Sequence, residues 1–365
     1  MKTNALKPVS LASSLVCLSL FGLAACEAKK TDAPAEPAAP AAAEVPESVK
    51  LQGAGASFPA PLYTRWFKTY GQTHSDVQID YQSVGSGSGV KAVINKTVDF
   101  GASDAAMSAE EIGRVAQGVQ LLPMTAGSIV LTYNLEGVSN LKLSRKAYTG
   151  IFMGQIKKWN DPAIAAANPG VKLPSTPVNV VVRADSSGTT FVFTKHLSEV
   201  SPEFAKSPGT NKMPNWPVGT RSKGNEGVTA SVKTTPGAIG YIEYGYAMSQ
   251  KLPTATLENK AGKFVEANTA SGQAALASAT LPEDMIAWAS DPEGADAYPI
   301  VTYTWLILYK QYADQRKLDT LRDLVKYAVT DGQAVAVELG YIPLPSTVAD
   351  KVKTAVESVK LASKN

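Results

Sequence analysis

Cysteine and histidine are almost absent from this chain of 365 residues. Both cysteines, Cys17 and Cys26, lie near the N-terminus, and none occurs in the 339 residues that follow. This distribution excludes a disulfide framework and a cysteine-based metal site. His74 and His196 are the only histidines. We therefore also expect no multi-histidine metal site and no cofactor.

An excess of charge of either sign is also lacking. The formal net charge is +3, and without Lys2 and Lys7, which lie in a segment that we expect to be removed, it falls to +1. Such a small charge does not indicate nucleic acid or a charged membrane surface as a partner. A hydrophobic content of 44% and a charged content of 18% are typical of a globular protein, and 365 residues are enough for two domains.

The N-terminal apolar run, residues 11–25, is too short to span a bilayer and is typical of a signal peptide. It ends in the sequence LAAC, and small residues before a single cysteine resemble the lipobox of bacterial lipoproteins. That resemblance implies that Cys26 is lipid-modified and becomes the first mature residue; the alternative is a plain signal peptide cut nearby. We expect a lipoprotein signal peptide over residues 1–25 and an Ala/Pro-rich, semi-rigid tether over residues 26–49.

Strand-like and helix-like segments alternate from Leu51 onward, which predicts an α/β fold. Two long apolar strands, near residues 128–133 and 300–309, bracket the middle of the chain. They suit two lobes joined by two crossings. The predicted lobe I is discontinuous, with residues 50–127 and 300–365, and lobe II has residues 128–299.

The later part of the chain carries weaker signals. Residues 200–225 are rich in Pro, Gly, Asn and Lys, so we expect a loop there, followed by a short helix over residues 227–233. Residues 250–280 suggest a hairpin and then a helix. Residues 318–329 and 332–339 are expected to form the closing helices.

One polar stretch, RADSSGTT at residues 183–190, lies where a strand ends and a helix begins. Such a junction offers unpaired backbone N–H groups and the positive end of a helix dipole. Glycine and small hydroxyl residues let an anion approach this backbone closely, and arginine adds planar donors suited to an oxyanion. The stretch therefore predicts half of a site for a small tetrahedral anion.

Three segments share this order of strand, Gly/Ser/Thr turn and helix: residues 51–60, 77–91 and 178–192. Any one of them alone reads as structural punctuation, but an anion held between two lobes needs donors from both. The expected donors are the backbone and side chains of Ser57, Ser86, Ser187 and Thr189, the backbone N–H groups of Phe58 and Gly188, and the guanidinium of Arg183.

Three motifs carry a resemblance to a known family: GAGASFPAP at 53–61, VDFGASD at 98–104 and RADSSGT at 183–189. They resemble the signature motifs of the phosphate-specific periplasmic binding proteins, the PstS family, in the family's order. The likeness runs from about residue 50 to the end. It implies a two-lobe periplasmic-binding-protein fold of type II with two crossover hinge strands.

The resemblance also implies a ligand and a set of contacts. Inorganic phosphate would be bound between the lobes and delivered to the transmembrane subunits of an ABC-type import permease. The protein would be a periplasmic or cell-envelope monomer, anchored to the membrane through Cys26, and not an enzyme. The family's phosphate contacts fall on Ser57, Phe58, Ser86, Asp104, Arg183, Ser187, Gly188 and Thr189, with Asp185 pairing the arginine.

Asp104 is the residue that bears on selectivity. An ionised carboxylate accepts hydrogen bonds and donates none. Phosphate at neutral pH carries a proton that such an acceptor can pair, whereas sulfate carries none, so one carboxylate favours phosphate and rejects sulfate. The structural alternative is that Asp104 is a helix N-cap or a turn residue.

Three functional alternatives remain at this point. One is a binding protein for another oxyanion, such as sulfate or molybdate. Another is a scaffold or adhesin that keeps the fold without the ligand. The third is a serine-dependent hydrolase built on Ser187, His196 and Asp185. His196 lies nine residues after Ser187, more than two helical turns away, which disfavours the hydrolase.

Overall fold

The computed structural model describes residues 48–363, which belong to one compact unit. The predicted signal peptide, Cys26 and nearly all of the predicted tether lie outside these residues. Within the described part of the chain, no helix is both long and apolar enough to span a bilayer.

A mixed sheet of nine strands runs through residues 48–363, with the strand order β2-β1-β3-β12-β4-β8-β6-β7 and β11 paired with β12. The elements up to the first long strand are β1 (Val49–Gly55), α1 (Ala60–Thr73), β2 (Val77–Ser83), α2 (Ser86–Ile94), β3 (Phe100–Ser103), α3 (Ala109–Gly113) and β4 (Val119–Tyr133). In this part β1 pairs in parallel with both β2 and β3.

The middle of the chain supplies the other end of the sheet, where β8 and β6 are parallel and β6 is parallel to β7. Its elements are β5 (Lys142–Leu143), α4 (Arg145–Phe152), α5 (Pro162–Ala165), β6 (Asn179–Arg183), α6 (Gly188–Val200), α7 (Pro202–Lys206), β7 (Thr220–Ser222), α8 (Gly224–Thr234), β8 (Ala238–Glu243), α9 (Tyr244–Gln250), β9 (Thr256–Glu258), β10 (Phe264–Val265), α10 (Thr269–Leu276) and β11 (Ala289–Ser290).

The C-terminal part returns to the first group of elements. It contains β12 (Ile300–Tyr309), β13 (Gln311–Tyr312), α11 (Gln315–Val329), α12 (Gly332–Glu338), α13 (Ser346–Glu357) and β14 (Lys360–Leu361). Trp66 of α1 donates a hydrogen bond of 2.8 Å to the carbonyl of Gly332, which ties α1 to the start of α12.

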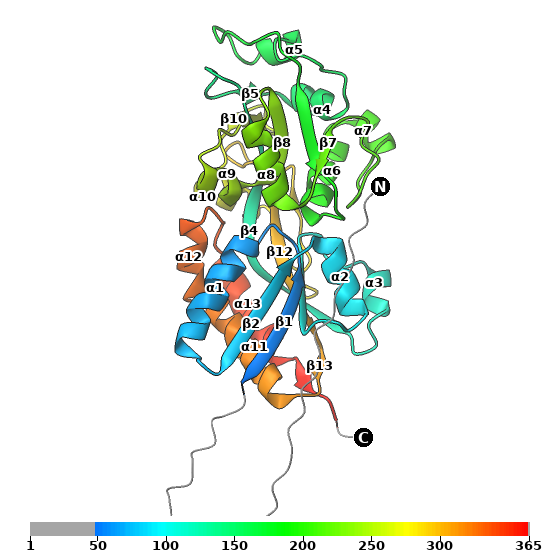
Figure 1. Cartoon of the computed structure of the whole chain (residues 1–365), viewed down its shortest axis with the longest axis vertical. Helices are drawn as coiled ribbons and strands as arrows, with labels where there is room; N and C mark the ends of the chain where they lie inside the picture. Colours follow the sequence, from blue (N-terminus) through cyan, green and yellow to red (C-terminus); the bar gives the residue numbers. More distant parts are fainter. Residues whose placement is uncertain (1–47, 364–365) are drawn as a thin grey trace, which may run out of the picture. The chain divides into compact units, whose positions relative to one another are not determined.

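Two long strands connect the halves of the sheet, as Figure 1 shows for β4 and β12. Both are buried along nearly their whole length, which explains why their sequences are apolar without alternation. β4 pairs with β12 up to Ser128 and with β8 from Ile129 onward, so one strand belongs to both halves. Helices α1, α11 and α13 lie with the first group, and α6, α8 and α9 with the middle group (Figure 1).

The predicted long strands agree with the structure, whereas several helices and the short strand β7 differ from the prediction. The Gly/Ser run after β2, expected as a turn, is the first turn of α2, which begins at Ser86. Residues 200–225 are not a continuous loop, because they contain α7 and β7, and α8 begins at Gly224. The last helix, α13, was not predicted. The hairpin of β9 and β10 and the helix that follows them are as expected.

Candidate functional site

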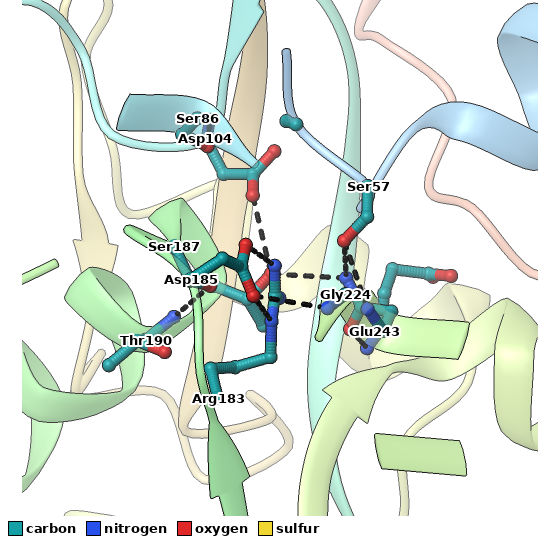
Figure 2. A network of polar contacts seen from close by, with 12 residues as sticks. Ser57, Ser86, Asp104, Arg183, Asp185, Ser187, Thr190, Gly224 and Glu243 are labelled. Atoms are coloured by element: carbon teal, nitrogen blue, oxygen red, sulfur yellow. Dashed lines mark hydrogen bonds and ion pairs between the residues drawn. The ribbon is translucent and has the colours of Figure 1, made fainter. Parts of the chain in front are cut away.

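The carboxyl ends of β1, β3 and β6 and the first turns of α2, α6 and α8 meet in one polar network (Figure 2). Ser57 follows β1, Asp104 follows β3, and Arg183 is the last residue of β6. Strand ends are where backbone groups leave the sheet ladder and where side chains can converge on a ligand. The network therefore joins residues that are more than a hundred positions apart.

Arg183 forms the positive centre of this network. Its side chain is 1% exposed, and it binds Asp185 through Nε to Oδ1 at 2.8 Å and through Nη2 to Oδ2 at 2.5 Å. Figure 2 shows the two groups facing each other. Burial raises the pKa of Asp185, but the hydrogen bonds and charge of Arg183 outweigh it and hold the pKa below its ordinary value. Asp185 does not contact Nη1 of Arg183, whose hydrogen bond to Thr189 Oγ1 is long, at 3.4 Å.

Asp104 is a second, fully buried carboxyl group close to this arginine. Its Oδ1 accepts a hydrogen bond of 2.9 Å from Thr304, and its Oδ2 accepts one of 3.3 Å from Thr189. Burial raises the pKa of Asp104 to about 7, against the opposing effects of the hydrogen bonds and of Arg183. A carboxyl group with a pKa near 7 can ionise at neutral pH at low energetic cost and then accept a hydrogen bond from a protonated group.

The first turns of α2 and α6 approach each other closely. The backbone N–H of Gly87 donates to the carbonyl of Ser186 at 2.9 Å. Gly188 packs so tightly that a Cβ there would lie 2.4 Å from Ser86 Oγ and 2.8 Å from Asp104 Cβ. Only glycine fits at such a distance. The first half of the predicted site thus touches the second half directly.

The hydroxyl groups of the two turns have different partners. Ser187 is the N-cap of α6, and its Oγ accepts a hydrogen bond of 3.0 Å from the backbone N–H of Thr190. Ser86 does not cap α2; its Oγ accepts a bond of 3.2 Å from the backbone N–H of Asp104. Both hydroxyl groups keep an O–H with which to donate.

Three tyrosine hydroxyls hold the carbonyl groups of the turn after β1. Tyr81 donates to Ala56 at 2.7 Å, Tyr246 to Ser57 at 2.6 Å and Tyr341 to Phe58 at 2.7 Å; these tyrosines belong to β2, α9 and the loop after α12. An oxyanion site must turn backbone acceptors away and present N–H donors. The tyrosines fix the acceptors in this way.

The chain is similar to known proteins over most of its length. A family model for a periplasmic-binding-protein (PBP) superfamily domain matches residues 35–331. The phosphate-binding protein PstS of Pasteurella multocida is 41% identical over 318 residues, which cover 84% of this chain and 91% of that protein. PstS of Haemophilus influenzae is 39% identical, over 83% of this chain and 91% of that protein.

The chain belongs to the PstS family of phosphate-binding proteins.

A solved structure gives the same fold at lower identity. A high-affinity periplasmic phosphate-binding protein, solved with phosphate bound, superposes with a TM-score of 0.70 at 22% identity, covering 84% of this chain and 93% of that one. The fold class expected for a PstS-family chain, an α/β periplasmic-binding-protein fold with two lobes and two crossover strands, is confirmed.

The predicted site residues of this PstS-family chain lie together. Hydrogen bonds or close contacts connect Ser57, Ser86, Asp104, Arg183, Asp185, Gly188 and Thr189, and Ser187 is adjacent to them as the cap of α6. Phe58 lies next to Ser57 and is fully buried. Cys26 lies outside the described residues.

Sequence reasoning missed two members of the network, Thr304 and Asn225. Thr304 stands in the middle of the apolar strand β12, and its Oγ1 bonds Asp104; a hydroxyl residue in a buried strand was the available signal. Asn225 lies in the stretch KGNEG at residues 223–227, and its residue type gave no reason to expect contacts with Ser57 and Thr189.

Both histidines of the PstS-family chain pack against tyrosine side chains away from the polar network. His196 is fully buried in α6, where its Nε2 lies 2.9 Å from the Tyr148 hydroxyl. His74 stacks on Tyr70 and contacts the carbonyl of that residue through Nδ1 at 3.0 Å. Neither arrangement provides a base for Ser187, whose Oγ is engaged in capping.

Proposed function

We propose that this chain binds inorganic phosphate between its two lobes and delivers it to an ABC-type phosphate import permease. The observation that carries the proposal is the buried network in which Arg183, Asp104 and Ser57 converge from three strand ends. The names of the relatives, phosphate-binding proteins with 39–41% identity, support the choice of ligand.

The proposed phosphate contacts come from both groups of elements. Arg183 supplies the counter-charge through Nη1, and the first turns of α2 and α6 supply backbone N–H groups and hydroxyls. The full set is Ser57, Phe58, Ser86, Asp104, Arg183, Ser187, Gly188 and Thr189, with Asp185 orienting the arginine.

Asp104 is the proposed selectivity element. Its carboxylate accepts the proton that phosphate carries, and with sulfate it would leave two acceptors facing each other unpaired. Burial raises the pKa of Asp104 even though Thr304 and Thr189 donate hydrogen bonds to it, so a ligand O–H is a favourable additional partner for its charged form.

Lobe I is proposed to consist of residues 50–127 and 300–365, and lobe II of residues 128–299. The change of partner along β4, from β12 at Ser128 to β8 at Ile129, supports a boundary at this position. Phosphate contacts both lobes in this arrangement and so favours the closed form by its differential affinity. Closure would then be the signal that the permease reads.

The protein itself is proposed to be a monomer without catalytic activity, located in the periplasm or cell envelope and anchored through an acylated Cys26. The sequence LAAC and the tether composition support the anchor. Mass spectrometry of the mature N-terminus tests it: a diacylglyceryl-modified Cys26 is expected, and a free terminus with an unmodified thiol would contradict it.

A thermal-shift series with phosphate, arsenate, sulfate and molybdate tests the ligand. Phosphate should raise the melting temperature most, because a ligand that binds only the folded state stabilises it by mass action. Arsenate, which also carries a proton, should follow, and sulfate and molybdate should have little effect. A larger shift with sulfate or molybdate than with phosphate would replace the proposal with a different oxyanion.

A further inference from the structure

Asn225 is a fully buried residue in the first turn of α8 that lies outside the proposed set of phosphate contacts. Its backbone N–H donates to Ser57 Oγ at 3.0 Å, and its Nδ2 donates to Ser57 Oγ at 2.9 Å and to Thr189 Oγ1 at 3.2 Å. Its Oδ1 accepts a bond of 2.9 Å from the backbone N–H of Glu243. Every polar group of this side chain has a partner.

The orientation of the amide follows from Glu243. A backbone N–H can only donate, so the atom of Asn225 that faces it must be the oxygen. The NH₂ group is therefore directed at the two hydroxyl groups. Because Glu243 ends β8, a strand of the sheet holds the amide in this orientation.

The two N–H groups of Asn225 determine what the Ser57 hydroxyl can do. A serine hydroxyl has two acceptor lone pairs and one O–H donor. Both lone pairs of Ser57 Oγ are used by Asn225, and the Ser57 carbonyl is held by Tyr246. The hydroxyl can therefore act toward a third group only as a donor, which is the polarity that an oxyanion requires.

Thr189 is polarised in the same way. Its Oγ1 accepts from Asn225 at 3.2 Å and from Arg183 at 3.4 Å, so its O–H is available as a donor, here to Asp104 Oδ2. One amide thus fixes the direction of two hydroxyl groups, one after β1 and one in α6.

We propose that Asn225 is a positioning residue for the oxyanion: it sets the Ser57 and Thr189 hydroxyls as donors and holds the turn after β1 in register with α6. This inference rests on the proposed function, phosphate binding. Asn225 acts through the two hydroxyl groups and does not itself contact the ligand.

A double-mutant cycle tests the coupling. Phosphate dissociation constants are measured by calorimetry for the whole mature protein and for Asn225→Ala, Ser57→Ala and the double variant. Each single change should weaken binding about ten-fold or more, because the lost hydrogen bond is made to a charged ligand. If Asn225 acts through the two hydroxyls, adding Asn225→Ala to Ser57→Ala should weaken binding clearly less than Asn225→Ala weakens it in the parent, because only the effect through Thr189 remains.

Asn225→Asp separates positioning from packing. This variant keeps the shape but faces Ser57 with an acceptor, so the serine O–H turns toward the new carboxylate and away from phosphate. We expect it to bind phosphate more weakly than Asn225→Ala does. A packing role would give the opposite order. If Asn225→Ala does not fold, the phosphate affinity of Asn225→Asp still tests the positioning role.

Asn259→Ala is the matched control. Asn259 is equally buried, and its Nδ2 donates to the carbonyls of Gly294, Ala295 and Ala297, away from the network. Its loss should lower the melting temperature and leave the phosphate dissociation constant within two-fold.

Two results would overturn the inference: losses that multiply in the double variant, or an Asn225→Ala variant that binds phosphate as tightly as the parent. Both leave the proposed function intact, because the parent still binds. If the parent itself does not bind phosphate, the proposed function fails first and the inference with it.

Discussion

Two arginine–aspartate pairs, the largely buried Arg183–Asp185 and the half-buried Arg145–Asp291, have similar contact distances but differ in which guanidinium nitrogens contact the carboxylate. Arg145 binds Asp291 end-on, with Nη1 to Oδ1 at 2.5 Å and Nη2 to Oδ2 at 2.7 Å. Arg183 binds Asp185 side-on, through Nε and Nη2. The side-on geometry leaves Nη1 pointing at the network, whereas the end-on geometry uses both terminal nitrogens.

The surroundings of the two pairs differ as well. Next to Asp291 lies His196, whose Nδ1 is 4.0 Å from the carboxylate, and Tyr148 closes the other side of the ring. Next to Arg183 lies Asp104, a second carboxyl group, which follows a different strand, β3. The comparison shows that an ion pair alone does not identify a binding site. What distinguishes Arg183 is a guanidinium N–H that Asp185 does not use, close to a second buried carboxyl group, Asp104.

Removing the two arginines should separate binding from stability. Arg183→Ala should weaken phosphate binding by at least about 30-fold, since truncating a buried charge partner costs about 2–5 kcal/mol. Arg145→Ala should lower the melting temperature and leave the dissociation constant within two-fold. Calorimetric titration of both variants checks this, and a similar loss of affinity in both would erase the distinction.

Asp104→Asn should change the choice of anion. The amide can donate a hydrogen bond to an unprotonated oxyanion, so the preference for phosphate over sulfate should fall by about ten-fold or more. Competition calorimetry with the two anions measures the ratio. An unchanged ratio would show that this carboxyl group does not read the ligand's proton.

The same variant should alter the pH dependence of stability without phosphate. The folded pKa of Asp104, about 7, lies above the ordinary value of 3.8, so the folded state keeps a proton that the unfolded state releases. The free energy of unfolding of the parent therefore falls as pH rises from about 4 to about 7, by about 4 kcal/mol. Asp104→Asn lacks this loss. Compared with the parent, it should be more stable at pH 8 and similar at pH 4 in urea unfolding.

His196 should give the opposite dependence in the second cluster. Burial lowers the pKa of His196 to about 4; Asp291 opposes this and Arg145 adds to it. The unfolded state takes up a proton that the folded state refuses, so the free energy of unfolding falls as pH drops from about 6.5 to 4, by about 3 kcal/mol. In His196→Gln this fall should be absent and phosphate affinity unchanged. An equally steep fall in the variant would assign it to other groups.

The exposed pair Lys260–Glu293 sets the lower end of the scale. Its atoms are 2.7 Å apart, but the side chains are 48% and 83% exposed, and solvent screens such pairs. Lys260→Ala should change neither the melting temperature nor the phosphate dissociation constant measurably. A clear loss in either would mean that the N–O distance, and not burial, determines how much these ion pairs stabilise the protein.

Local chemistry made much of the fold predictable. The long β-branched strands and the Gly/Ser turns after β1 and β6 depend on neighbours in sequence, and the structure has them where they were expected. Residues 200–225 were misread because Pro and Gly also occur at helix starts, as Pro202 does in α7 and Gly224 does in α8.

The site was predictable where a motif carried it and not where contacts cross the chain. Thr304 reaches Asp104 from 200 positions away, and Asn225 reaches Ser57 from 168. No local pattern marks such pairs, because their meaning depends on the pairing of β12 with β3 and on the placement of α8. Asparagine in particular is common at caps and in turns, so its presence near a helix start did not indicate a buried role.

The fit around Gly188 has a practical consequence. At 2.4 Å from Ser86 Oγ, an added methyl group would act as a wedge between the two turns. Gly188→Ala should then keep the two lobes from closing fully while the variant retains every charged side chain of the site. A transport assay with this variant would show whether the permease responds to the closed form of the binding protein or to the bound phosphate itself.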